Sequence, residues 1–108
     1  MDGNITIKYL QKYLKATDAG DYPVRKDWFV KLSEEVGELA RAIRSDATAE
    51  NTGSLKGSVD EEIWDVIYYA IGLANCYGID LEDVIPKKFA LSAEKYPKKI
   101  EFGEEIPD

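Results

Sequence analysis

Hydrophobic residues recur every three or four positions over four stretches of the chain, which is the period of an amphipathic helix. These stretches cover about residues 6–15, 25–44, 59–77 and 81–97, and turn-forming residues separate them. No stretch shows the strict alternation of apolar and polar residues that marks a half-buried strand. The pattern predicts an all-α protein, a helical bundle of four main helices that we expect dimerisation to complete.

The two long helices each carry an apolar stripe, through which they could pack against each other. Polar residues occupy the rest of each helix surface. The stripe of the second helix consists of Phe29, Leu32, Val36, Leu39, Ala40 and Ile43, and that of the third of Ile63, Val66, Ile67, Ala70, Leu73, Ala74 and Tyr77.

Residues typical of helix ends lie at the borders of these stretches. Ser58 and Glu61 form an S-x-x-E capping box at the start of the third helix, and Gly78 is a natural stop after it. Asp80 is the expected cap of the fourth helix, which contains Pro86. Because proline lacks a backbone N–H, we expect Pro86 to kink or restart that helix.

The remaining segments predict loops within one domain. Gly20 and Pro23 should break the chain between the first two helices. Residues 45–58 are rich in Ser, Thr, Asn and Gly, which predicts a flexible surface loop. The tail from about residue 100 is expected to be loosely ordered. No shift in composition marks a boundary, so residues 1–108 are interpreted as a single domain.

Four carboxylates stand out on the two long helices. Glu35 and Glu38 are three residues apart, as are Glu62 and Asp65, so each pair shares one helix face. By helical phase, each pair lies beside the apolar stripe of its own helix. If the edges of the two helices meet, four carboxylates line one cleft. Oxygen ligands of this kind suit Mg²⁺, with Mn²⁺ as an alternative. A solvated acidic surface is the competing interpretation of the same residues.

Composition narrows the classes of function. The net charge of −7 argues against a nucleic-acid polymer as partner, because phosphate backbones are bound by clustered Lys and Arg. Histidine is absent and Cys76 is the only cysteine, which excludes imidazole sites, His-based triads and cysteine clusters. A lone thiol, a polar N-terminal segment and the lack of a long apolar run predict a cytoplasmic protein without a membrane segment.

The motifs resemble those of a known family. The segments KLSEEVGELARAI and DEEIWDVIYYAIGLANCYGIDLEDV are similar to the MazG-type all-α nucleoside triphosphate pyrophosphohydrolases, which carry an E-x-x-E pair and an E-x-x-D pair on adjacent helices. The segment KKFALSAEKYPKK is similar to the family's K-x-x-x-N-x-x-K-Y-P segment, with Ser92 in place of the asparagine. The resemblance covers about residues 28–99.

This resemblance implies a homodimer or a dimer of dimers that holds Mg²⁺ with Glu35, Glu38, Glu62 and Asp65. It also implies hydrolysis of a nucleoside triphosphate between its α- and β-phosphates, giving a nucleoside monophosphate and pyrophosphate, in the house-cleaning of non-standard nucleotides. A carboxylate must orient or deprotonate the attacking water. We assign that catalytic role to Glu38.

Substrate contacts are expected from two further regions. Lys88, Ser92 and Lys95 are spaced i, i+4 and i+7, so they share a helix face that suits phosphate groups. Lys31 precedes Glu35 by four residues and is expected to reach the same cleft. Tyr69 lies on the acidic edge of its helix, where it is a candidate to stack on the base.

Two other classes of function stay open at this point. One is a non-catalytic helical module for dimerisation and protein interaction, with solvated acids. The other is a nucleotide sensor that binds without turnover.

Overall fold

The computed structural model describes residues 3–18 and 25–108, and all regular secondary structure in that part of the chain is helical. The all-α prediction is therefore confirmed. The expected breakers Gly20 and Pro23 lie outside the described residues. The helices are α1 (Ile7–Asp18), α2 (Arg25–Arg44), α3 (Ala49–Thr52), α4 (Val59–Cys76) and α5 (Leu81–Lys95).

The segment 45–58 contains a short helix, α3, that the sequence pattern does not predict. Thr48 begins it, because its hydroxyl accepts a hydrogen bond from the Asn51 N–H. Gly53 ends it with a φ of 73°, a conformation that favours glycine. The carboxylate of Asp60 in α4 accepts a 2.7 Å hydrogen bond from the Ala49 N–H, so α3 is attached to the start of α4.

The predicted cap of α4 is confirmed. Ser58 is buried, and its hydroxyl accepts a hydrogen bond from the Glu61 N–H while donating one to the Leu55 carbonyl. The Glu61 carboxylate accepts a hydrogen bond from the Gly57 N–H, whereas in a full capping box it would accept one from the Ser58 N–H. These bonds fix the first turn of α4 against the loop that precedes it.

The predicted restart of α5 at Pro86 is wrong. Asp80 caps the helix through the Glu82 N–H, as expected, but α5 continues through Pro86 to Lys95. Proline so near the N-terminus removes a single backbone hydrogen bond, the one to the Glu82 carbonyl, and the rest of the helix retains its own.

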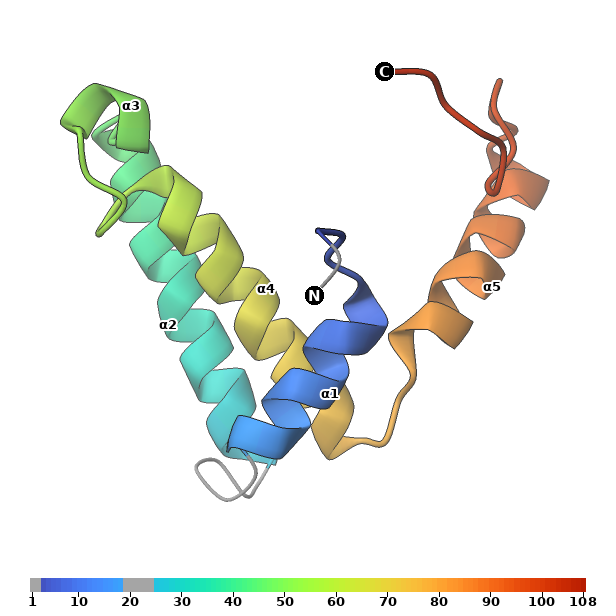
Figure 1. The fold of residues 1–108 in the computed structure, drawn as a ribbon, viewed down its shortest axis with the longest axis horizontal. Coiled ribbons are helices and arrows are strands. Elements are labelled where there is room, and N and C mark those ends of the chain that lie inside the picture. Colours follow the sequence, from blue (N-terminus) through green and yellow to red (C-terminus); the bar gives the residue numbers. More distant parts are fainter. Residues whose placement is uncertain (1–2, 19–24) are drawn as a thin grey trace.

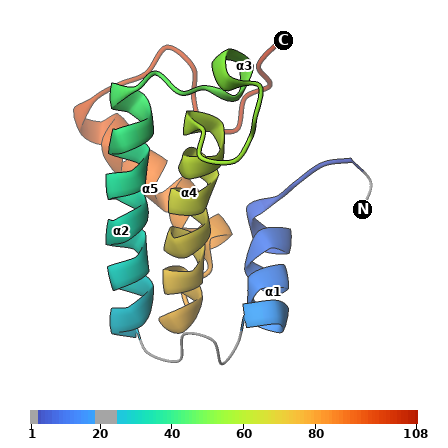
Figure 2. The same ribbon diagram turned by 90° about the vertical axis from the view of Figure 1, so that its left-hand side faces the viewer.

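The core lies between α2 and α4, which run side by side along most of their length (Figures 1 and 2). Trp28 of α2 is almost fully buried and its ring lies directly over Gly72 of α4. A Cβ atom added at Gly72 would lie 1.9 Å from the indole ring. The two helices therefore approach closely at this point because position 72 has no side chain. Helix α1 covers part of α4 through the buried Leu14.

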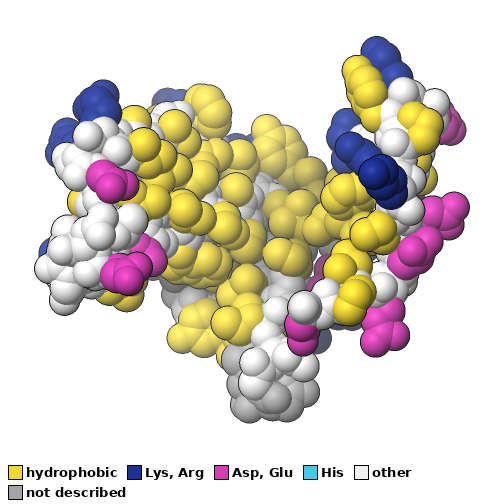
Figure 3. Space-filling view, turned by 90° about the horizontal axis from the view of Figure 1, so that it is seen from above, with side chains coloured by type: hydrophobic (Ala, Val, Ile, Leu, Met, Phe, Trp, Pro, Cys, Tyr) yellow, Lys and Arg dark blue, Asp and Glu magenta, His cyan; other side chains and the backbone are white. Residues whose placement is uncertain are grey.

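Much of the two apolar stripes lies outside this core, although Ala74 of the α4 stripe is buried. Phe29, Val36 and Ile43 of α2 are 58%, 50% and 58% exposed, and Ile63 and Ile67 of α4 are also largely exposed. The helices instead meet through neighbouring faces, where the Trp28 ring of α2 packs on Gly72 of α4. This packing leaves an apolar surface on the α2–α4 pair. Figure 3 shows a broad hydrophobic region on the side of the molecule seen from above.

Helix α5 extends away from the α2–α4 pair and contacts α1 (Figure 1). The radius of gyration is 16.4 Å, whereas a close-packed chain of this length is expected near 13 Å. A single chain is therefore open, and exposed apolar side chains such as Val84, Phe89 and Leu91 line α5. None of the helices in the described residues is both long and apolar enough to cross a bilayer.

Candidate metal centre

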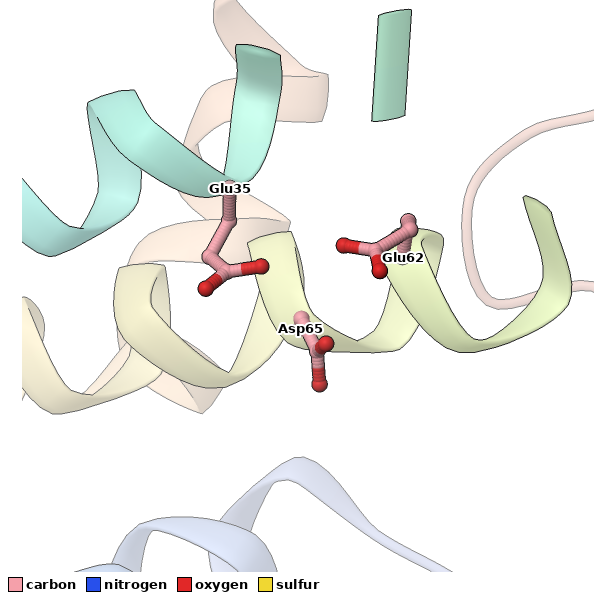
Figure 4. A group of neighbouring side chains, drawn as sticks. All are labelled: Glu35, Glu62 and Asp65. Carbon is pink, nitrogen blue, oxygen red and sulfur yellow. The ribbon is translucent and has the colours of Figure 1, made fainter. Parts of the chain in front are cut away.

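Three of the four predicted carboxylates meet in the interface between α2 and α4. Glu35 projects from α2 towards α4, where Glu62 and Asp65 lie one turn apart (Figure 4). One carboxylate oxygen from each residue lies within 4.8 Å of those of the other two. We call these residues the acid cluster. The sequence leaves open whether the two acidic edges meet, and the structure brings three of the four acids together between the helices.

The acid cluster is electrostatically strained without a cation. The pKa of the Glu62 carboxyl is raised from 4.5 to about 7, first by burial, then by hydrogen bonding to Glu35 and by the charges of Asp65, Glu35 and Glu61. The pKa of Asp65 is also raised, first by burial and then by Glu35 and Glu61. Burial and like charges both favour the neutral acids.

Glu62 shows why the acid cluster fits a divalent cation. Only 8% of the residue is exposed, and its Oε2 atom is buried without a hydrogen-bond partner. An unpaired buried carboxylate oxygen is costly to a fold unless something compensates its charge. Three carboxylates with neither nitrogen nor sulfur donors match the preference of Mg²⁺ or Mn²⁺ for oxygen. The described residues therefore fit such an ion, which Glu35, Glu62 and Asp65 would hold.

Glu38 lies outside the acid cluster. Its side chain is 47% exposed and its Oε2 atom lies 3.4 Å from Arg41 Nη1. Its predicted role as a ligand and as the catalytic base stays a prediction. One turn of helix separates it from Glu35, so it lies beside the acid cluster on the same side of α2.

Lys31 and Tyr69, both predicted to bind substrate, lie together one turn from the acid cluster. The Lys31 ammonium is 5.9 Å from the centre of the Tyr69 ring and 3.2 Å from a carboxylate oxygen of Glu34. Tyr69 also contacts the Trp28 ring, with 5.7 Å between centroids. These contacts give an aromatic surface beside the acids.

The predicted contacts on α5 are not brought near the acid cluster within one chain. Lys88 and Lys95 are exposed, and Ser92 is half-buried. Because α5 extends away from α2 and α4 (Figure 1), these three residues could meet acids only across an interface between chains.

The sequence pattern does not reveal the pairing of Trp28 with Gly72, which sets the distance between the helices that carry the acids. A tryptophan and a glycine 44 positions apart have no spacing that predicts contact. A glycine inside an otherwise apolar helix is the one available signal, since glycine there weakens the helix unless close packing requires it.

The fold and the acid cluster define a class of all-α proteins whose adjacent helices bring together carboxylates suited to a divalent cation. The chain belongs to the MazG nucleotide pyrophosphohydrolase domain family, which it matches over residues 27–99. All three acids and α5 fall within the matched region.

Relatives support this assignment. The chain resembles crystal structures of iMazG from Vibrio DAT 722 at 38% identity. With the N-terminally tagged form the TM-score is 0.72, over 87% of this chain and all of that one. With the C-terminally tagged form the TM-score is 0.70, over 82% of this chain and 98% of that one. It is also 40% identical over 62 residues to "Uncharacterized protein YvdC" of Bacillus subtilis (strain 168); the match spans 50% of this chain and 58% of that protein.

Proposed function

We propose that this protein is a Mg²⁺-dependent nucleoside triphosphate pyrophosphohydrolase. It cleaves between the α- and β-phosphates and releases a nucleoside monophosphate and pyrophosphate, and non-standard nucleotides are its proposed substrates. The observation that carries the proposal is the buried, unpaired Glu62 oxygen within a group of three carboxylates. Membership of the MazG family supports the same reaction.

The acid cluster has the chemistry that this reaction needs. Glu35, Glu62 and Asp65 would hold the cation, which when bound supplies positive charge against the triphosphate and lowers the pKa of water at the site. Lys31 and Tyr69, one turn away, would contact a phosphate and the base respectively. The enclosed position of Glu62 keeps bulk water from this side of the site.

Metal binding and product release test the proposal together. We expect Mg²⁺ or Mn²⁺ to raise the melting temperature, because the cation binds only the folded acid cluster. We also expect pyrophosphate release from a panel of standard and modified nucleoside triphosphates in the presence of Mg²⁺. Absence of any metal effect would favour the non-catalytic helical module, and nucleotide binding without release would favour the sensor.

Glu38 is the proposed base that orients or deprotonates the attacking water. Glu38→Gln should lower turnover by about 10²-fold or more, the usual contribution of such a group. Divalent-cation affinity, measured by calorimetry, should remain within a few-fold, because Glu38 lies outside the acid cluster. Arg41→Gln is a matched control, since it removes the ion-pair partner of Glu38 but leaves the carboxylate. Turnover near that of the unaltered protein in Glu38→Gln would exclude this role.

A second copy of the chain is the proposed cover for the exposed apolar stripes. Phe29, Val36 and Ile43 recur every seven residues on one face of α2, a spacing suited to helix packing. The α5 residues Lys88, Ser92 and Lys95 would then reach an acid cluster of the partner chain, either in a homodimer or in a dimer of dimers.

Val36→Glu should convert this oligomer to monomers, because a charge in an apolar helix contact is strongly unfavourable. Sedimentation or light scattering measures the change in mass, and pyrophosphate release should fall with it. Glu50→Lys, which alters a charge on α3 away from the stripe, is the control. A Val36→Glu protein of unchanged mass would show that this stripe is not the interface.

A further inference from the structure

A cleft lies between α1 and the turn that joins α4 to α5. It has a volume of about 210 Å³. Its lining consists of Lys8, Gln11, Lys12, Lys15, Asn75, Gly78, Ile79 and Asp80. We call it the α1 cleft. Because each helical residue advances 1.5 Å, Asn75 lies about 20 Å along α4 from Glu62. The α1 cleft is therefore separate from the acid cluster.

A network of hydrogen bonds fixes the floor of the α1 cleft. The Gln11 amide nitrogen donates to Asn75 Oδ1 at 2.9 Å and to the Ile79 carbonyl at 2.8 Å. Its Oε1 atom accepts the Leu81 N–H, and the Asn75 amide donates to the Gln11 carbonyl. Gln11 and Asn75 thus hold α1 against the α4–α5 turn, and the polar groups of both side chains are used within the protein.

Three lysines of α1 supply the remaining donors. Lys8, Lys12 and Lys15 are spaced i, i+4 and i+7, so they follow one side of the helix over roughly 10 Å. Among the described residues, none of the three forms an ion pair. The nearby carboxylates accept hydrogen bonds from backbone N–H groups instead. The Asp80 carboxylate accepts one from the Glu82 N–H, and the Glu82 carboxylate accepts one from the Lys8 N–H.

This arrangement favours a small anion with several charges. Lysine ammonium groups are point charges that bind phosphate oxygens from any direction, and three in a row match linked phosphates better than a single carboxylate. The lining contains no aromatic side chain on which a base could stack. A concentration of positive charge on α1 also contrasts with the net charge of −7 of the chain.

We propose that the α1 cleft binds a pyrophosphate group, either as the free ion or as the phosphate end of a nucleotide. Lys8, Lys12 and Lys15 contact the phosphate oxygens, while Gln11 and Asn75 keep the cleft open at a fixed width. This binding needs no divalent cation and does not involve Glu62. The site therefore stands whether or not the protein hydrolyses nucleotides.

The test is a titration of the full chain with inorganic pyrophosphate and, separately, with ADP, followed by NMR of backbone amides at physiological ionic strength. EDTA is present so that the acid cluster holds no cation. Saturable shifts should appear in residues 8–15 and 75–81. Replacing Lys8, Lys12 and Lys15 together by glutamine should weaken binding roughly tenfold or more, since each exposed charge pair contributes a modest share.

The matched control replaces Lys56, Lys98 and Lys99 by glutamine. It changes the net charge equally, and none of these residues lines the α1 cleft. Binding of pyrophosphate with shifts at the cleft supports the proposal, and equal binding of ADP shows that a nucleotide end also fits. Loss of affinity in the control as large as in the α1 variant, binding of ADP alone, or no binding of either ligand would overturn it.

Discussion

Replacing Glu62 with glutamine is expected to abolish divalent-cation binding and to lower pyrophosphate release at least ~100-fold. Loss of a residue that merely supports a metal ligand already costs 10–100-fold, and Glu62 is a proposed ligand itself. Its carboxylate is the most enclosed of the acid cluster. Calorimetry with Mg²⁺ or Mn²⁺ measures the first effect, and a pyrophosphate assay the second. Glu50→Gln, a neutralised exposed acid on α3, should leave both unchanged.

The same substitution should stabilise the protein when no cation is present, and the effect depends on pH. The Glu62 pKa is about 7 in the folded protein and 4.5 when unperturbed, so the folded state retains a proton that the unfolded state loses between these values. Stability in EDTA must therefore fall as the pH rises from 4.5 through 7, and the raised pKa of Asp65 acts in the same direction.

Melting curves of both proteins in EDTA across this pH range measure the difference. In Glu62→Gln the decline should be much smaller, because the main titrating group has been removed. An identical decline in both proteins would show that other groups cause it and that Glu62 is not the strained carboxyl.

Gly72→Ala should produce the largest loss of stability among single conservative changes in α4. The added Cβ atom would lie 1.9 Å from the Trp28 ring, so the helices must separate or the indole must move. Overpacking of this kind costs about 1–3 kcal/mol or more, which outweighs the helix preference of alanine. The melting temperature should fall by roughly 4–8 °C for each kcal/mol. Cation affinity should fall as well, because Glu35 moves away from α4.

Gly37→Ala is the matched control, since nothing lies within 4 Å of a Cβ atom at that helical position. Alanine there should be neutral or stabilising by up to ~1 kcal/mol. Combining Gly72→Ala with Trp28→Leu should recover part of the loss, because the smaller side chain makes room for the methyl group. Strictly additive losses in the double variant would contradict direct contact as the cause.

Local signals in the sequence predict the helices and their caps. The apolar period gives α2 its bounds, and the Ser58 and Asp80 caps are both present. These features depend on residues close in sequence. The sequence pattern does not predict the extra helix α3, because a single turn is too short to show a period.

Which helix packs against which face depends on contacts between residues far apart in the sequence, and a local pattern does not predict these contacts. The residues on α2 offer two adjacent faces, one with Trp28 and Glu35 and one with Phe29 and Val36. Hydrophobicity alone favours the face with Phe29 and Val36 as the contact with α4. In the structure α4 instead packs on the face with Trp28, because Gly72 leaves room for the indole ring. Because the sequence does not show which faces of α2 and α4 meet, it identifies the acids as candidate ligands but places them at the edge of the helix contact. In the structure they lie between the two helices.

The unpaired oxygen of Glu62 has a consequence for the lifetime of the protein. A cation that binds only the folded acid cluster adds about 2.7 kcal/mol at 100 times its dissociation constant. Proteases that cleave transiently opened chains act in proportion to the opened population. Resistance to digestion should therefore track the concentration of free divalent cation, so that a bound ion would protect the chain from degradation in addition to the catalytic role proposed for it.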